Sequence, residues 1–227
     1  VPNKTTMSIL ECILIDASSN KIKFTANDME LGIETVVEGT ILEHGIIALE
    51  AKLFSEMIRK LPDNNVMIWS DEKMDTLITC EKSKFHIMGK DGEDFSNLTV
   101  IEKKNPVRIS QFTLKEIIRQ TTFSLAVNDS NKMMTGELIE INGDELRVAA
   151  LDGHRIAIRR IELNDDYEPV KVVVPGKTLN EVSKILSGET EDTVNIYFTQ
   201  NHIMFQFDQT IVVSRLIEGS YFRVDHM

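Results

Sequence analysis

The chain has 227 residues, 42% hydrophobic and 27% charged, which is the composition of a globular protein with room for two domains. Its formal net charge of −11 argues against general adhesion to nucleic acid but leaves room for a local basic surface. No apolar run approaches the roughly 20 residues of a membrane span, and no secretory signal pattern is present. Cys12 and Cys80 lie in apolar, strand-like segments, so we expect buried free thiols and a cytoplasmic protein.

The segment 133–160 has the pattern of a hairpin followed by a loop and a further strand. Apolar and polar residues alternate in 138–141 and again in 146–149. Between them, Asn142-Gly143-Asp144 favours a tight turn, because Asn and Gly tolerate positive φ. The loop 151–155 then leads into the next strand.

A fainter copy of this segment stands at 8–37, and the likeness continues downstream. The paired positions are Asp28 with Asp152, Lys52 with Lys177, Leu61 with Leu186, and Phe95 with Tyr221. The offsets are 152 − 28 = 124, 177 − 52 = 125, 186 − 61 = 125 and 221 − 95 = 126. A nearly constant offset of this size predicts two copies of one domain rather than a short solenoid repeat.

The two predicted domains are 1–105 and 106–227, and the charged segment 102–105 is the linker between them. The second copy opens at Pro106 with a predicted strand and helix before its hairpin. The equivalent start of the first copy falls at 106 − 125 = −19. We therefore expect the first copy to lack its first strand and helix.

Three amphipathic helices are predicted, at 51–61, 113–121 and 178–187, where apolar residues recur with the 3.6-residue period. Their polar faces carry seven bases and three acids, an excess of 7 − 3 = +4. These are Lys52, Arg59, Lys60, Lys115, Arg119, Lys177 and Lys184 against Glu56, Glu116 and Glu181. Short alternating segments between the helices predict strands, so each copy is expected to be an α+β domain of antiparallel hairpins with helices on one side.

Two patterns resemble enzyme sites without completing one. Gly176-Lys177-Thr178 follows a strand and opens a helix, but a phosphate-binding loop needs glycine at position 171, where this chain has Lys171. Asp152, His154 and Arg155 stand together without a nucleophile in a recognisable context. The remaining histidines are scattered singly, without metal-ligand spacing. We therefore expect no catalytic site, no metal and no cofactor.

Five motifs occur in one order along the chain: 120–124, 132–136, 151–157, 173–179 and 214–219. Together they resemble the bacterial sliding clamp family, the β subunit of DNA polymerase III. The likeness covers nearly the whole chain and corresponds to the first two of the family's three domains. It implies repeated clamp domains that close head to tail as a homodimer when the third domain is present, with antiparallel sheets outside and helices lining the inner face.

The resemblance also implies site residues. The implied DNA-binding positions are Lys4, Lys52, Asn128, Lys132 and Met133. The implied pocket for partner peptides comprises Met134, Leu151, His154, Arg155, Ile156, Phe222 and Val224. Leu151, Phe222 and Val224 differ from the residues usual in the family. The strand with Phe85 and Ile87 is the implied dimer edge.

The function implied by the resemblance is a non-enzymatic processivity factor that encircles duplex DNA and tethers the replicative polymerase. Its implied partners are double-stranded DNA, the catalytic subunit of DNA polymerase III, the clamp loader, and other polymerases and repair proteins that carry short apolar peptide motifs. A protein-interaction scaffold that uses the same pocket without encircling DNA is the alternative. A nucleotide-dependent enzyme built on Gly176-Lys177-Thr178 is the third hypothesis.

Overall fold

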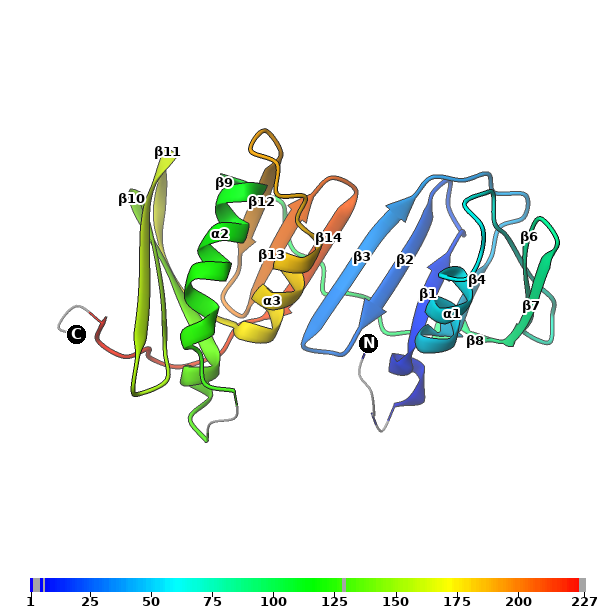
Figure 1. Ribbon diagram of the computed structural model, residues 1–227, viewed down its shortest axis with the longest axis horizontal. Helices are drawn as coiled ribbons and strands as arrows, with labels where there is room; N and C mark the ends of the chain where they lie inside the picture. The colour runs from blue at the N-terminus through cyan, green and yellow to red at the C-terminus, as the bar shows by residue number, and fades with distance from the viewer. Residues whose placement is uncertain (2–4, 6, 128–129, 225–227) are drawn as a thin grey trace. The chain divides into compact units, whose positions relative to one another are not determined.

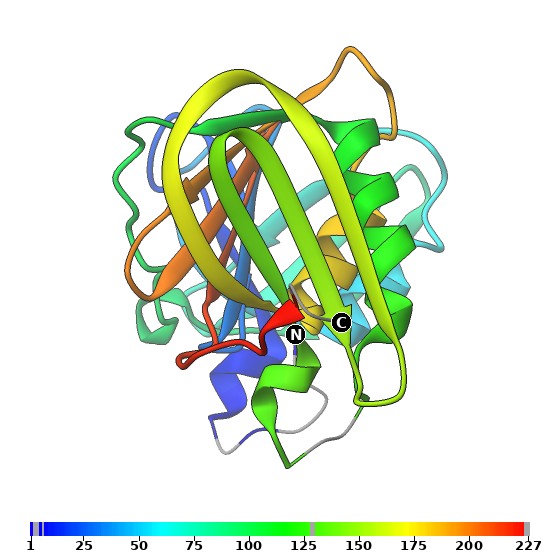
Figure 2. The same ribbon diagram turned by 90° about the vertical axis from the view of Figure 1, so that its left-hand side faces the viewer.

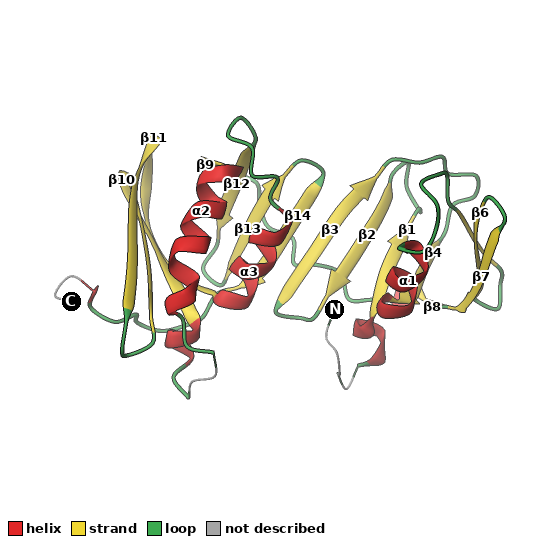
Figure 3. Cartoon of the chain, in the orientation of Figure 1, coloured by secondary structure: helices red, strands yellow, loops and turns green. Residues whose placement is uncertain are grey.

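The structure, a computed structural model, describes residues 1, 5, 7–127 and 130–224 (Figure 1). The chain divides into two compact units, Val1–Leu98 (unit 1) and Thr99–Met227 (unit 2). Antiparallel strands predominate and a few helices lie against them (Figure 3). This arrangement confirms the predicted α+β class.

Unit 1 contains two antiparallel sheets and one α-helix. In sheet order the strands are β8 (Lys90–Asp91), β4 (Ile46–Glu50), β1 (Cys12–Asp16), β2 (Ile22–Asn27) and β3 (Leu31–Val37), and separately β5 (Met67–Ser70), β6 (Asp75–Cys80) and β7 (Ser83–Met88). The 3₁₀ helices are η1 (Ser8–Glu11) and η2 (Gly92–Asp94). Helix α1 (Ala51–Ile58) packs on β1 and β4, where Phe54 stacks with Phe24 at 6.1 Å between ring centroids. Its apolar face therefore builds the core, as the sequence period predicted.

Unit 2 has the same kinds of element. Its strands are β9 (Val107–Ser110), β12 (Thr193–Phe198), β13 (His202–Phe207) and β14 (Thr210–Arg215) in one sheet, and β10 (Gly136–Leu151) with β11 (Ile156–Pro175) in another. Its helices are α2 (Gln111–Thr121), η3 (Thr122–Ser124), η4 (Lys132–Thr135) and α3 (Gly176–Ile185). Helices α2 and α3 pack side by side and both contact β11 (Figure 1). Their apolar faces are thereby buried against the sheet.

The helix ends follow from local hydrogen bonds. Helix α2 begins two residues earlier than predicted, because the Ser110 hydroxyl accepts a bond from the Thr113 N–H at 3.1 Å and caps it. Helix α1 ends at Ile58 rather than Leu61, where the chain tightens into turns before Pro62. Helix α3 ends at Ile185, and Lys115 of α2 donates to the carbonyl of the next residue, Leu186, at 2.9 Å. Lys115 thus ties the two helices together.

The hairpin turn predicted at 142–144 is a bend inside one strand. β10 runs through these residues and pairs with β11 on both sides of them. The register breaks between Ile141 and Glu145, and Gly143 has φ +63°. Both strands arch over, with β11 outside β10 (Figure 2). The prediction of two separate strands is therefore wrong, because β11 follows the bend and supplies strand partners on either side of it.

The duplication seen in the sequence is present in the loop geometry. In unit 1, Asp28 Oδ1 accepts from the N–H groups of Glu30 and Leu31, at 3.1 and 2.7 Å. In unit 2, Asp152 Oδ1 accepts from the N–H groups two and three residues on, at 3.1 and 3.2 Å. The residue after each aspartate has positive φ, +73° at Met29 and +84° at Gly153. One loop conformation is therefore built twice around an aspartate, although the residues that follow the aspartate differ.

Candidate functional site

An apolar cluster in unit 2 gathers most of the residues predicted to bind partner peptides. Its buried members are Leu138, Ala149, Leu151, Val173, Tyr221 and Val224, and its partly buried members are Met133, Met134, Ile156, Ile217 and Phe222. We call this set the unit 2 apolar cluster. It brings together five of the seven predicted pocket residues, from strands, a 3₁₀ helix and the segment after β14. His154 and Arg155 lie in the exposed loop immediately before Ile156.

Tyr221 anchors the segment after β14 and is a residue of the site that the sequence analysis did not predict. Its hydroxyl donates to the carbonyls of Gly136 and Ala149, at 3.4 and 3.2 Å. Its ring meets Phe222 edge-on, with 5.6 Å between centroids. Burial raises the pKa of the phenol above its usual value, so it remains a neutral donor. The only available signal was its match to Phe95 in the repeat.

The loop at 152–155 is fixed by one carboxylate. Asp152 Oδ1 accepts the two backbone N–H groups of the loop, and Oδ2 accepts from Arg155 Nε at 2.8 Å. The hydrogen bond from the His154 N–H, helped by Arg155, holds the pKa of Asp152 below its usual value. A charged aspartate therefore keeps Arg155 beside the unit 2 apolar cluster. The arrangement is suited to binding and contains no nucleophile.

Glu137 is a buried acid that the sequence did not single out. Its side chain lies on β10, is 1% exposed, and has an oxygen, Oε1, without a hydrogen-bond partner among the described residues. Burial raises its pKa to about 8, opposed by a hydrogen bond from Thr121 of α2. The charge that Glu137 would carry when ionised adds to burial in raising the pKa of Tyr221. Glu137 is therefore protonated in the folded protein at neutral pH.

An ion triad lines a cleft of about 540 Å³ in the β10–β11 sheet. Glu140 accepts from Arg147 on the far side of the bend, and Lys171 of β11 lies 3.0 Å from its other oxygen. The two cations hold the pKa of Glu140 below its usual value against the effect of burial. Glu140 is thus saturated by partners within the protein. The triad joins the two halves of the bent strand.

The structure describes three of the five predicted DNA-binding residues, Lys52, Lys132 and Met133. Lys4 and Asn128 lie outside the described residues. Lys52 is exposed on α1 of unit 1, and Lys132 is exposed at the start of η4 in unit 2. Met133 packs against the unit 2 apolar cluster, so the structure groups its side chain with the predicted pocket.

Several of the helix bases are engaged in contacts within the protein. Arg119 pairs with Glu116 at 2.6 Å and Lys184 with Glu181 at 2.7 Å. Lys115 is engaged at the end of α3, as described above. The net excess of +4 is unchanged, because these acids were already counted, but at least three of the seven bases are engaged within the protein.

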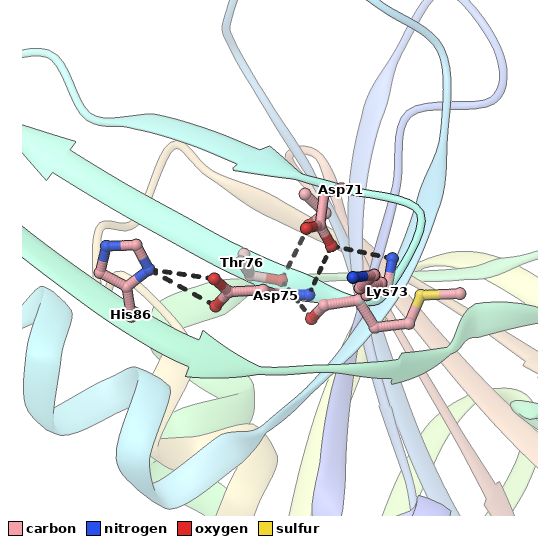
Figure 4. A network of polar contacts seen from close by, with 7 residues as sticks. Asp71, Lys73, Asp75, Thr76 and His86 are labelled. Carbon is pink, nitrogen blue, oxygen red and sulfur yellow. Dashed lines mark hydrogen bonds and ion pairs between the residues drawn. The ribbon is translucent and has the colours of Figure 1, made fainter.

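The predicted dimer edge lies on β7, the last strand of the order β5-β6-β7. Phe85 and Ile87 point into the unit 1 core, and Ile87 is only 4% exposed. His86 points to the other face, with Nδ1 3.3 Å from Asp75 Oδ2 (Figure 4). Asp71 accepts from the N–H groups of Lys73 and Asp75, both at 2.9 Å, and fixes the turn before β6. A strand that pairs with β7 would therefore hydrogen-bond to its backbone, while Phe85 and Ile87 hold β7 against the unit 1 core.

The Gly176-Lys177-Thr178 motif opens α3 and forms no phosphate loop. The Thr178 hydroxyl is buried and lies 2.6 Å from the Ser214 hydroxyl of β14. A Cβ on Gly176 would come within 2.5 Å of Leu125 and 3.0 Å of the Thr135 carbonyl. Close packing therefore accounts for the glycine and the threonine. The hypothesis of a nucleotide-dependent enzyme at this motif is wrong.

Among the described residues, no group of three or more His, Cys, Asp or Glu side chains is placed to hold a metal ion. In the same part of the chain, no helix is both long enough and apolar enough to cross a membrane.

Both units match one known family. Residues 1–99 match the N-terminal domain of the DNA polymerase III beta subunit, and residues 108–222 match its central domain. The chain is 35% identical over 226 residues to the beta sliding clamp of Staphylococcus epidermidis and 34% identical to that of Staphylococcus aureus. Each match covers 96% of this chain and 60% of the relative. The chain thus spans 60% of the length of these curated relatives.

Solved structures agree over the whole chain. A putative DNA polymerase III beta subunit from Eubacterium rectale has a TM-score of 0.97 and 62% identity, and the sliding clamp of Bacillus subtilis has 0.94 and 34%. The sliding clamp of Pseudomonas aeruginosa bound to griselimycin has 0.90 and 26%. Each covers 100% of this chain and 62% of the other chain.

Proposed function

The chain belongs to the family of DNA polymerase III beta subunits, the bacterial sliding clamps, and from this premise we propose that it acts as a processivity factor in DNA replication. It is an accessory protein with no catalytic site of its own. In the proposed role it encircles duplex DNA as part of a ring and keeps the replicative polymerase attached. The observation that carries the proposal is the match of both units to the two corresponding domains of the family.

The proposed domains are 1–105 and 106–227, each a clamp domain with helices toward the DNA and sheets outside. Lys52 and Lys132 are the described lysines that supply sequence-independent contacts to phosphates. The proposed DNA-binding set also includes Lys4, Asn128 and Met133. A homodimer closes through the backbone of β7 when a third domain is present.

The unit 2 apolar cluster is the proposed site for partner peptides. Apolar side chains from four segments meet there, and the loop with His154 and Arg155 adds polar groups at its edge. An apolar surface with a few polar anchors suits short apolar motifs. The proposed partners are the catalytic subunit of DNA polymerase III, the clamp loader, and other polymerases and repair proteins. The proposed location is the cytoplasm.

The test of the clamp role is retention on DNA of different topology. The full-length gene product is loaded onto nicked circular DNA with its clamp loader, and the isolated complex is then linearised. Release on linearisation supports a closed ring held by topology. Equal retention on linear DNA contradicts it, and absence from both forms while the catalytic subunit still binds favours the scaffold alternative.

The peptide site has its own test. Met134→Asp and Ile156→Asp place a charge in the apolar cluster and should abolish binding to the catalytic subunit, measured by biolayer interferometry. Leu42→Asp is the matched control, because Leu42 is 80% exposed in unit 1. Unchanged binding by both cluster variants would remove the site from this surface.

A further inference from the structure

Phe123 is an exposed aromatic residue next to the loop at 152–155. It lies on η3, directly after α2, and is 59% exposed. It is not a member of the unit 2 apolar cluster. A ring at this exposure contributes little to the core, so burial does not explain its presence.

The guanidinium of Arg155 lies over the ring. The guanidinium carbon of Arg155 lies 5.9 Å from the centroid of the Phe123 ring, within the range of a cation–π interaction. Arg155 Nε also donates to Asp152 Oδ2 at 2.8 Å. The guanidinium is therefore held by the aromatic face and by the carboxylate. Asp152 is itself fixed, because its other oxygen accepts the backbone N–H groups of the loop.

The held guanidinium stands at the rim of the apolar cluster, since Ile156, the next residue, packs against that cluster. The side chain of Arg155 is 54% exposed and would otherwise sample many rotamers. A side chain that is already ordered loses less entropy when a ligand binds. Its terminal Nη groups can then donate to backbone carbonyls of a peptide whose apolar side chains enter the cluster.

We propose that Phe123 is a positioning residue of the peptide site: its ring and Asp152 together hold the Arg155 guanidinium for the backbone of a partner peptide. The proposal rests on the proposed function of the unit 2 apolar cluster. It extends the peptide site to η3 and assigns the backbone carbonyl groups of the peptide as the acceptors for Arg155.

The test measures the affinity of the whole chain for the DNA polymerase III catalytic subunit of the same organism. Phe123→Ala should weaken binding about two- to fivefold, the range of an exposed cation–π contact, whereas Phe123→Tyr should restore it. Phe112→Ala is the matched control, because Phe112 is also an exposed phenylalanine of this segment, 44% exposed on α2. Its affinity should match the original chain.

A double-mutant cycle separates positioning from a direct contact of the ring. In an Arg155→Ala background, Phe123→Ala should cause no further loss of affinity. An equal loss in both backgrounds would overturn the proposal, as would an unchanged affinity for Phe123→Ala alone. Met134→Asp separates the proposal about Phe123 from the proposed peptide site. If Met134→Asp binds the catalytic subunit normally, the peptide site itself is misplaced. If Met134→Asp fails to bind while Phe123→Ala binds with full affinity, only the role of Phe123 is refuted.

Discussion

Replacing Glu137 by glutamine should stabilise the protein and remove a defined part of its pH dependence. The carboxyl group is buried on β10, and its pKa rises from the ordinary value of 4.5 to about 8. Glutamine has nearly the same shape and cannot ionise. The substitution therefore keeps the packing and removes the cost of ionising a buried acid.

The sign follows from proton linkage. Between pH 4.5 and about 8 the folded protein keeps the Glu137 proton and the unfolded chain has lost it. The folded state then binds more protons, so the free energy of unfolding falls as pH rises, by about 1.4 kcal/mol per pH unit for one group. From pH 5 to pH 8 this group should lower stability by on the order of 4 kcal/mol, and above pH 8 its effect is constant.

Urea unfolding at pH 5, 6, 7 and 8, followed by far-UV circular dichroism, measures this contribution. All other groups titrate in both proteins, so the difference in unfolding free energy isolates Glu137. Glu145→Gln is the matched control, because Glu145 lies on the same strand with its side chain 58% exposed. Trp69, the single tryptophan, lies in unit 1 and follows that unit separately by fluorescence.

Two results would refute the reasoning about Glu137. One is a Glu137→Gln protein whose stability falls further below that of the original as pH rises, which would show that an ionised carboxylate has favourable partners in the fold. The other is a difference in unfolding free energy that does not change with pH, which would show that the pKa of Glu137 is the same in the folded and unfolded states.

Glu140→Gln should act in the opposite direction and destabilise the protein by about 1–3 kcal/mol at pH 7, because Arg147, only 11% exposed, loses its carboxylate partner. The loss of stability should shrink as pH falls through the lowered pKa of Glu140, which urea unfolding at pH 3 to 7 tests. Tyr221→Phe should cost about 1 kcal/mol in the same assay, since two backbone carbonyls lose their donor, and full stability would contradict the anchor role. Gly153→Ala should lower the free energy of unfolding by about 1–2 kcal/mol through backbone strain at φ +84° alone, because nothing lies within 4 Å of the new Cβ. Met29→Gly, at the matching position of unit 1, should leave stability unchanged or raise it, and a loss of stability from Met29→Gly would contradict the strain argument.

The helices, strands and loops could be predicted where the sequence pattern that specifies them is local. The three helices appear where apolar residues recur with the helical period, and their ends moved by two to three residues because caps and final turns decide them. The repeat located the aspartate loops, because a side chain that accepts two backbone N–H groups needs only adjacent residues. The bend at Gly143 was placed correctly, but the continuity of β10 was missed because it depends on β11, which follows later in the chain.

The candidate site was predicted less completely than the fold. Glu137 sits among alternating strand residues and looks like an ordinary exposed acid, because its burial comes from α2, which packs over it from elsewhere in the chain. Arg119 and Lys184 each pair with an acid three residues earlier on the same helix, a local contact that the sequence spacing already allowed. The miss at Glu137 has a different cause, because its burial depends on a contact between distant segments, of which a single sequence contains no direct record.

The comparison of the two repeats explains why the proposed peptide site belongs to unit 2 alone. The unit 1 counterpart of the apolar cluster contains Ile9, Leu10, Cys12, Leu14, Ala48 and Phe95, all of them buried. Ile9 and Leu10 lie on η1, the match of η4, and fill this cluster, whereas Met133 and Met134 of η4 remain partly exposed. The loop beside the unit 1 cluster has Met29 and Glu30 where unit 2 has Gly153 and His154. Duplication thus provided the same scaffold twice, but among the described residues the unit 1 cluster has a single partly buried neighbour, Ile46, and its loop has Leu31 in place of Arg155.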